Sequence, residues 1–192
     1  MGDARRRDNR TQTTADGLAL ARLVEQQLDP LSQARLRDLQ VGRDGRAWRC
    51  LAVGAGTGSM AQWLADEVGL RGTVVATTGT GAATDTDGED GTALPHLEQH
   101  RRPNVTVTQF DLATDDLPTA CTLAFDLVHC RLALAKQPDP AAALRKLADA
   151  VAPGGVLLVE EWDVGSMLLC DESRPDAAAA RTMLAALTDA AR

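Results

Sequence analysis

The chain has 192 residues, a formal net charge of −7 and only 3% aromatic residues. This length suits one domain with a sizeable apolar core. The acidic balance, with Lys136 and Lys146 as the only lysines, argues against nucleic acid as a partner. No run approaches the roughly 20 apolar residues that a membrane span needs, so we expect no membrane contact.

The N-terminus and the cysteines of the chain indicate the cellular compartment that we expect for it. The N-terminus is charged and lacks the apolar segment of a secretory signal. The four cysteines show no CxxC spacing, so we expect reduced thiols and a cytoplasmic protein. The acidic run at 160–163 has no histidine at useful spacing, because His96 and His100 fall on another segment. The sequence therefore predicts no metal site.

The first part of the chain predicts helices. Residues 1–14 are polar, and we expect a disordered tail there. In residues 15–45, leucines at helical spacing predict two helices, the first ending at Asp29 and Pro30 and the second running through Leu36. These helices could cover a ligand site or only cap the sheet, and the second role is favoured.

Residues 50–58, Cys-Leu-Ala-Val-Gly-Ala-Gly-Thr-Gly, are the stretch around which the chain is organised. Residues 49–53 predict a short buried strand, and 59–65 have helical periodicity. A strand, a glycine-rich turn and a helix form the first unit of a nucleotide-binding fold, in which glycines let the backbone turn and approach a ligand. Ser59 stands where the dinucleotide pattern G-x-G-x-x-G has its third glycine, which disfavours that ligand. A tight turn that binds nothing stays open.

The remaining elements alternate between strands and helices. Apolar or β-branched runs predict strands at 72–77, 105–110, 123–129 and 156–159. Helices are expected near 94–100, after Pro138, where Asp139 suits the N-cap, and at 175–191. Residues 78–91 are low in complexity and predict a surface loop. This alternation predicts an α/β fold, a parallel sheet with helices on both faces, whose ligand lies past the carboxyl ends of the strands.

Four segments in this order resemble the motifs of one family. Residues 48–58 resemble its first motif, 110–112 its adenine-contacting segment, 125–131 its fourth motif, and 152–160 the loop and strand that follow. Over residues 18–163 the chain thus resembles the class I S-adenosylmethionine-dependent methyltransferases of the small-molecule type. The resemblance implies a Rossmann-like, three-layer fold of strand order 3-2-1-4-5. It also implies S-adenosylmethionine as the cofactor and methyl transfer to a small molecule as the reaction.

The resemblance also implies how the chain is divided. A single methyltransferase-like domain would span 15–192, with the helices at 15–45, the Rossmann-like core at 46–163 and a C-terminal helix in 164–192.

The same resemblance implies roles for individual residues. Cofactor contacts are expected from the turn, the strand ends and the loop after the second strand: Gly54, Ala55, Gly56, Gly58, Thr78, Asp85, Asp111, Leu112 and His129. Asp111 is the expected acceptor for the adenine amino group, or it only caps its own turn. His129 could act as general base, although a supporting polar role is favoured. Arg131 and Trp162 are expected on the substrate side, Arg131 pairing with a substrate carboxylate or with a neighbouring acidic loop.

Departures from the family leave alternatives open. Ala52 stands where the family has a carboxylate, and Thr78 where it has a ribose-binding acid, for which Asp85 could substitute. No segment predicts the two antiparallel strands that follow the fifth strand in the family. These departures keep open a degenerate or truncated, non-catalytic relative. A nicotinamide-dependent enzyme is a less favoured alternative, because Ser59 and the missing acid at the end of the second strand argue against it. The absent strands would also expose one edge of the fifth strand, through which a homodimer could form.

Overall fold

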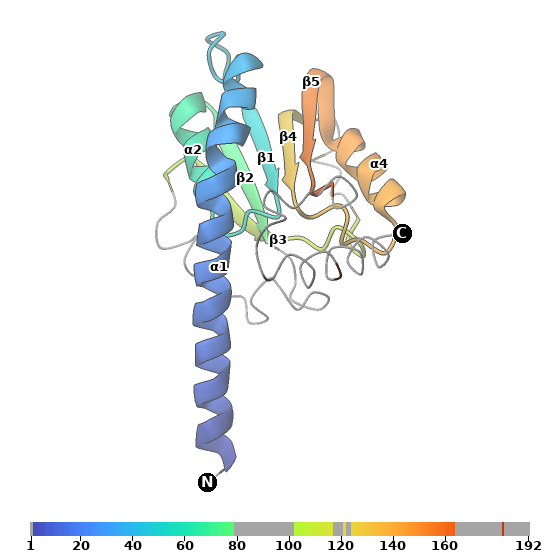
Figure 1. The fold of residues 1–192 in the computed structure, drawn as a ribbon. Coiled ribbons are helices and arrows are strands. Elements are labelled where there is room, and N and C mark those ends of the chain that lie inside the picture. The colour runs from blue at the N-terminus through green and yellow to red at the C-terminus, as the bar shows by residue number, and fades with distance from the viewer. Residues whose placement is uncertain (1, 79–101, 117–120, 122–123, 164–181, 183–192) are drawn as a thin grey trace. The chain divides into compact units, whose positions relative to one another are not determined.

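The structure, a computed structural model, describes residues 2–78, 102–116, 121, 124–163 and 182, with side chains from residue 19 onward. It divides into two units, Met1–Glu160 and Glu161–Arg192. The first unit holds the sheet and the helices that pack on it (Figure 1). Four expectations lie outside the described residues, namely the surface loop beyond residue 78, Asp85, the helix near 94–100 and, except for residue 182, the helix at 175–191.

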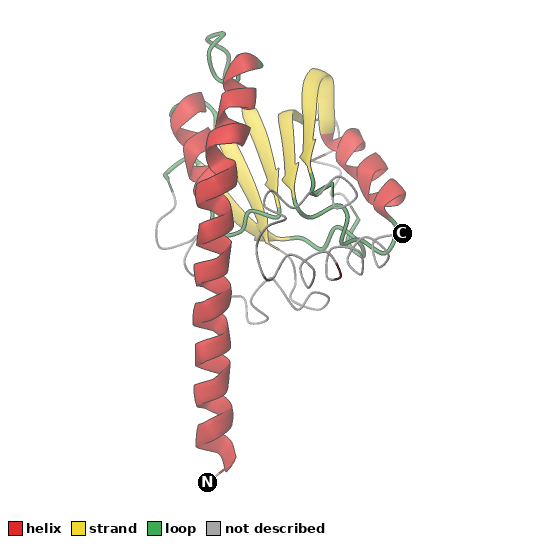
Figure 2. Ribbon diagram, in the orientation of Figure 1, coloured by secondary structure: helices red, strands yellow, loops and turns green. Residues whose placement is uncertain are grey.

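A parallel sheet of five strands forms the middle layer of the first unit (Figure 2). In chain order its strands are β1 (Arg49–Val53), β2 (Thr73–Thr78), β3 (Val105–Gln109), β4 (Phe125–Arg131) and β5 (Val151–Glu160). They lie in the order β3-β2-β1-β4-β5, and each neighbouring pair is parallel. The predicted α/β, Rossmann-like fold and its strand order are confirmed.

The side chains of β1 show why the sheet has helices on both faces. Cys50 and Ala52 belong to one apolar core together with helix α2 (Ser59–Val68). Leu51 and Val53 belong to a second core together with helix α4 (Pro140–Ala150). Successive side chains of a strand point to opposite faces, so a strand that is apolar throughout needs cover on both. These two cores separate the three layers of the fold.

Helix α1 (Gly2–Asp38) differs from the prediction in two respects. Residues 2–14 are helical, where we expected a disordered tail, and the helix continues through Pro30, where we expected a break. A proline inside a helix lacks the N–H of the helical hydrogen bond and usually kinks or ends the helix. Here Asp29 and Ser32, on either side of Pro30, bond to Arg131 and Glu160 of the sheet. These tertiary contacts offset the local cost of the proline.

The bounds of strands β4 and β5 also differ from the prediction. β4 runs from Phe125 to Arg131 and not from 123 to 129, so Arg131 lies within the strand and not beyond it. β5 begins at Val151, because the Pro-Gly-Gly segment at 153–155 lies in the strand and not in a turn before it. A register shift against β4 and a φ of 80° at Gly154 accommodate this segment. The N-cap of α4 is as predicted, with Asp139 accepting a hydrogen bond from a backbone N–H at 2.9 Å.

Candidate active site

The glycine-rich turn joins β1 to α2 at the carboxyl edge of the sheet. Gly54, Gly56 and Gly58 have φ values of 68°, 56° and 95°, which residues with a side chain rarely adopt. The N–H of Ala55 donates to the carbonyl of Thr77 at 3.0 Å, which ties the turn to β2. Gly58 caps α2 without a side-chain hydrogen bond, so the first N–H groups of the helix have no side-chain acceptor there. The turn therefore offers a helix N-terminus to a polar ligand group.

Two buried hydroxyl groups adjoin this turn and have no hydrogen-bond partner in the described part of the chain. They are the Oγ of Ser59, the first residue of α2, and the Oγ1 of Thr78, the last residue of β2. Buried polar groups are nearly always hydrogen-bonded, because leaving one unpaired costs about 1–3 kcal/mol. Ligand hydroxyl or amino groups would satisfy both oxygens. The residues present at this edge thus fit a polar cofactor.

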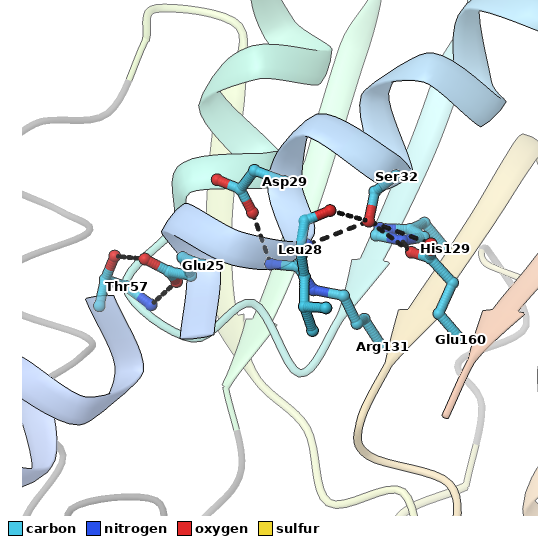
Figure 3. Close-up of polar contacts among 8 residues, drawn as sticks. All are labelled: Glu25, Leu28, Asp29, Ser32, Thr57, His129, Arg131 and Glu160. Atoms are coloured by element: carbon cyan, nitrogen blue, oxygen red, sulfur yellow. Dashed lines mark hydrogen bonds and ion pairs between the residues drawn. The ribbon is translucent and has the colours of Figure 1, made fainter. Parts of the chain in front are cut away.

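Helix α1 presents three polar side chains toward the same edge (Figure 3). Glu25, Asp29 and Ser32 are spaced i, i+4 and i+7, which places them on one face of the helix. The Glu25 side chain is buried, and its carboxylate accepts hydrogen bonds from the N–H of Thr57, at 2.8 Å, and from the Thr57 hydroxyl. α1 therefore contacts the glycine-rich turn directly, in addition to packing on the sheet.

The other two residues of this face bind β4 and β5 (Figure 3). Arg131 donates to the Oδ1 of Asp29 at 2.7 Å and to the Oγ of Ser32 at 3.1 Å. The Ser32 hydroxyl donates to the Glu160 carboxylate at 2.8 Å, and the Nε2 of His129 lies 2.5 Å from the same carboxylate. One polar network thus fixes the helix to the carboxyl ends of both strands.

This network sets the ionisation of Glu160. Burial alone would raise the pKa of this carboxyl group. Hydrogen bonds from His129 and Ser32, together with the charges of His129 and Arg131, outweigh burial and hold the pKa below its ordinary value. The carboxylate form of Glu160 is therefore the form that the folded chain favours.

His129 and Arg131 lie at this edge of the sheet, but both side chains are already bound to carboxylates of the chain. His129 is 3% exposed, and its Nε2 is bound to Glu160. This arrangement favours the supporting polar role over the general base, which must reach a proton on the substrate. Arg131 does pair with an acid of the chain, but that acid, Asp29, lies on α1 and not in a loop.

Past β3, Asp111 and Leu112 lie in a turn whose backbone is hydrogen-bonded by the Asp111 side chain. The Oδ1 of Asp111 accepts the N–H of Ala113 at 2.8 Å, as in a turn-capping aspartate. Leu112 is buried, and its carbonyl accepts a hydrogen bond from the Nζ of Lys146 on α4 at 2.8 Å. The turn-capping alternative is thus present, and the adenine contact of Asp111 stays a prediction.

Among the described side chains, other reactive groups do not form a second catalytic centre. Burial, with a further contribution from Asp126, raises the pKa of the Cys50 thiol to about 12, and a thiol that stays protonated is a poor nucleophile. The described ranges contain no cluster of three His, Cys, Asp or Glu residues suited to a metal ion.

No helix in the same ranges is both long and apolar enough to cross a membrane. Trp162 is 51% exposed and belongs to the second unit.

Sequence reasoning did not identify Glu25, Asp29 or Ser32. Their polar spacing on a helix was a signal, because it interrupts the leucines of the same segment. Their partners lie 32 to 128 residues further along the chain, so no local pattern connects them. The helix-to-sheet contacts become visible only in three dimensions.

Comparison with known proteins places this geometry in a class. Residues 16–189 match the family model described as a methyltransferase domain. A solved S-adenosylmethionine-dependent methyltransferase from Aquifex aeolicus is 18% identical with a TM-score of 0.51, over 76% of this chain and 72% of that one. A provisionally assigned methyltransferase of the same kind from Methanococcus maripaludis is 16% identical with a TM-score of 0.55, over 76% and 62%. Likenesses at this identity show the fold alone.

The chain belongs to the class I S-adenosylmethionine-dependent methyltransferases, and S-adenosylmethionine is the cofactor of this class. It spans less than half the length of some solved methyltransferases that it matches. One from Mesorhizobium loti, 22% identical with a TM-score of 0.46, is covered over 45% of its length by 59% of this chain. Among curated proteins, none matches the sequence.

Proposed function

We propose that this chain transfers a methyl group from S-adenosylmethionine to a small molecule in the cytoplasm. The observation that supports the proposal is the turn between β1 and α2, with its positive-φ glycines and the unpartnered hydroxyls of Ser59 and Thr78 beside it. Strand ends and a helix N-terminus converge there, at the position where such sheets bind their ligands.

Several groups of this edge would share the task of holding the cofactor. The N-terminus of α2 suits a carboxylate, because the helix dipole and the first N–H groups favour negative charge. The hydroxyls of Ser59 and Thr78 suit hydroxyl or amino groups of the ligand. Asp111, with Leu112 beside it, remains the proposed acceptor for the adenine amino group. When bound, the cofactor supplies a methyl group on a positively charged sulfur.

The contribution of the chain to the reaction is mainly placement. A displacement at a methyl group needs the nucleophile in line with the bond that breaks, and such placement can lower a barrier by up to about 7–11 kcal/mol. The network of Asp29, Ser32, Arg131 and Glu160 fixes α1 against the strand ends and so keeps this edge in one geometry. A base is needed only for an acceptor that must lose a proton, and His129 is the proposed candidate.

On the substrate side, Arg131 and Trp162 remain the proposed contacts. The guanidinium group of Arg131 is bound to Asp29 and Ser32, so it would have to share or release these partners to meet a substrate carboxylate. Trp162 offers an exposed apolar ring.

A second function, cofactor binding without catalysis, is favoured by the end of β1. Ala52 is buried and offers no carboxylate there. The acid beside the turn, Glu25, comes from α1 and is bonded to Thr57 of the chain itself. A chain altered in this way could retain the cofactor and transfer nothing.

We also propose self-association through the edge of β5. In the described residues β5 pairs only with β4, and an unpaired strand edge recruits other chains readily. Sedimentation velocity over a hundredfold range of protein concentration tests this proposal. A shift from monomer to dimer is expected, and a monomer at every concentration would contradict it.

Transfer of a labelled methyl group tests the proposed function. The chain is incubated with methyl-labelled S-adenosylmethionine and with panels of small molecules that carry hydroxyl, amino or activated carbon nucleophiles. Label in an acceptor, absent with Gly56→Val, is the expected result. Cofactor binding without transfer to any panel favours the second function, and absence of cofactor binding contradicts both.

A further inference from the structure

The Glu25 carboxylate lies against the glycine-rich turn and not merely near it. Its Oε1 would be 2.7 Å from a Cβ placed on Gly56, the closest atom to that position. The same oxygen accepts the N–H of Thr57 at 2.8 Å, and the other oxygen accepts the Thr57 hydroxyl. Glu25 is 8% exposed, so little solvent reaches this carboxylate.

The charge of Glu25 lacks a cationic partner among the described side chains, whereas the neighbouring acids have one. Asp29 is paired with Arg131, and Glu160 is bound to His129 and also lies in the field of Arg131. The guanidinium group of Arg131 thus serves Asp29 and Glu160, and Glu25 has no cation of its own. Burying an uncompensated charge is costly, and a cation that arrives nearby reduces this cost. The turn is therefore lined by negative charge that suits a positively charged ligand.

We propose that Glu25 is a specificity-determining residue, which makes the site prefer the cofactor with its positively charged sulfonium over the uncharged thioether that remains after methyl transfer. The inference rests on the proposed function. The two ligands share their adenosine and amino-acid parts and differ in the methyl group and the charge on sulfur. Charges in a partly dry site attract one another over several ångströms, so Glu25 needs no direct contact with the sulfur. Such a preference would help the product to leave.

Two substitutions separate the charge of Glu25 from its hydrogen bonds. Glu25→Gln keeps the size of the side chain and an oxygen that accepts the Thr57 N–H, but it removes the charge. Thr57→Val removes the hydroxyl contact and leaves the carboxylate in place. Asp38→Asn, on the exposed side of the same helix, is the control for a lost surface charge.

The experiment is calorimetric titration of each variant with S-adenosylmethionine and with S-adenosylhomocysteine. Glu25→Gln is expected to weaken binding of the sulfonium ligand about tenfold, equivalent to about 1.4 kcal/mol, with a much smaller change for the thioether. Thr57→Val is expected to change both affinities alike, and Asp38→Asn neither. Where Glu25→Gln does not fold, Glu25→Asp is titrated in its place. It keeps the charge but draws the carboxylate back by one methylene, so the sulfonium ligand is expected to lose more affinity than the thioether, and an equal loss would overturn the proposal.

An equal loss of both affinities in Glu25→Gln would overturn the proposal, because Glu25 would then act on a group that both ligands share, such as the ammonium group, or only by positioning Thr57. Unchanged affinities would overturn it as well. A parent chain that binds neither ligand would contradict the proposed function itself, and the titration of the parent separates that failure from the failure of this inference.

Discussion

The imidazole of His129 on β4 and the carboxylate of Glu160 on β5 lie 2.5 Å apart, at the carboxyl end of two neighbouring parallel strands. The histidine is 3% exposed, and the carboxylate is also bonded to Ser32 of α1. This pair therefore links the sheet to the helix that reaches the glycine-rich turn.

Acid should loosen this link. The folded state holds the pKa of Glu160 below its ordinary value of 4.5, so the folded chain binds fewer protons there than the unfolded chain does. The stabilisation by the carboxylate is fully present above about pH 4.5 and is lost as the pH falls through the lowered pKa. Urea unfolding at several pH values between about 6 and 3 should show the parent and Glu160→Gln converging in stability toward acid. A constant difference would contradict this account of the pair.

Removing the charge of Asp29 should destabilise the chain. Asp29→Asn weakens the 2.7 Å bond to Arg131 and leaves a largely buried guanidinium group without its counter-charge. Hydrogen bonds to charged groups are worth about 1.5–3 kcal/mol, and we expect a loss of unfolding free energy of that order. Asp38→Asn, at an exposed site of the same helix, should stay within about 0.5 kcal/mol. Equal effects of the two changes would mean that the Asp29–Arg131 pair contributes nothing.

A methyl group at Gly56 should disturb the turn twice. Gly56→Ala strains a backbone with φ of 56° and drives its Cβ to 2.7 Å from the Glu25 carboxylate. Gly45→Ala is the matched control, because φ is 77° there and nothing lies within 4 Å of the added Cβ. Both should lose about 1–2 kcal/mol from backbone strain, but only Gly56→Ala should also weaken cofactor binding. If Gly45→Ala weakens binding as much, the turn is not the ligand site.

Removing the unpartnered hydroxyl of Thr78 should affect stability and cofactor affinity in different directions. Thr78→Val has nearly the same shape and removes a buried polar group that lacks a partner among the described residues. Without ligand, the stability should stay the same or rise, because no hydrogen bond is lost. With S-adenosylmethionine the affinity should fall several-fold if the ligand uses this oxygen. Thermal unfolding with and without the ligand measures both effects, and a loss of stability without ligand would show that the hydroxyl has a partner within the protein.

Much of the fold could be predicted because its signals are local. β1 has the predicted bounds, 49–53, and Asp139 caps α4 as its position before Pro140 indicates. The sheet order followed from the resemblance of four ordered segments to one family. The turn at Gly54, Gly56 and Gly58 was recognisable because left-handed backbone favours glycine.

The errors arose where distant contacts override local preference. Pro30 predicts a helix end, but bonds from its neighbours to Arg131 and Glu160 hold the helix through it. The Pro-Gly-Gly segment at 153–155 predicts a turn, but a register shift against β4 admits it into β5. The carboxylate beside the turn comes from Glu25, 32 residues away from Thr57, where no motif would indicate it.

Titration of the parent chain with S-adenosylmethionine and with NAD decides whether the glycine-rich turn between β1 and α2 binds S-adenosylmethionine. We expect saturable binding of S-adenosylmethionine at one site, weakened by Gly56→Ala but not by Gly45→Ala, and no binding of NAD. Saturable binding of NAD, or absence of binding by S-adenosylmethionine to a folded chain, would contradict this expectation.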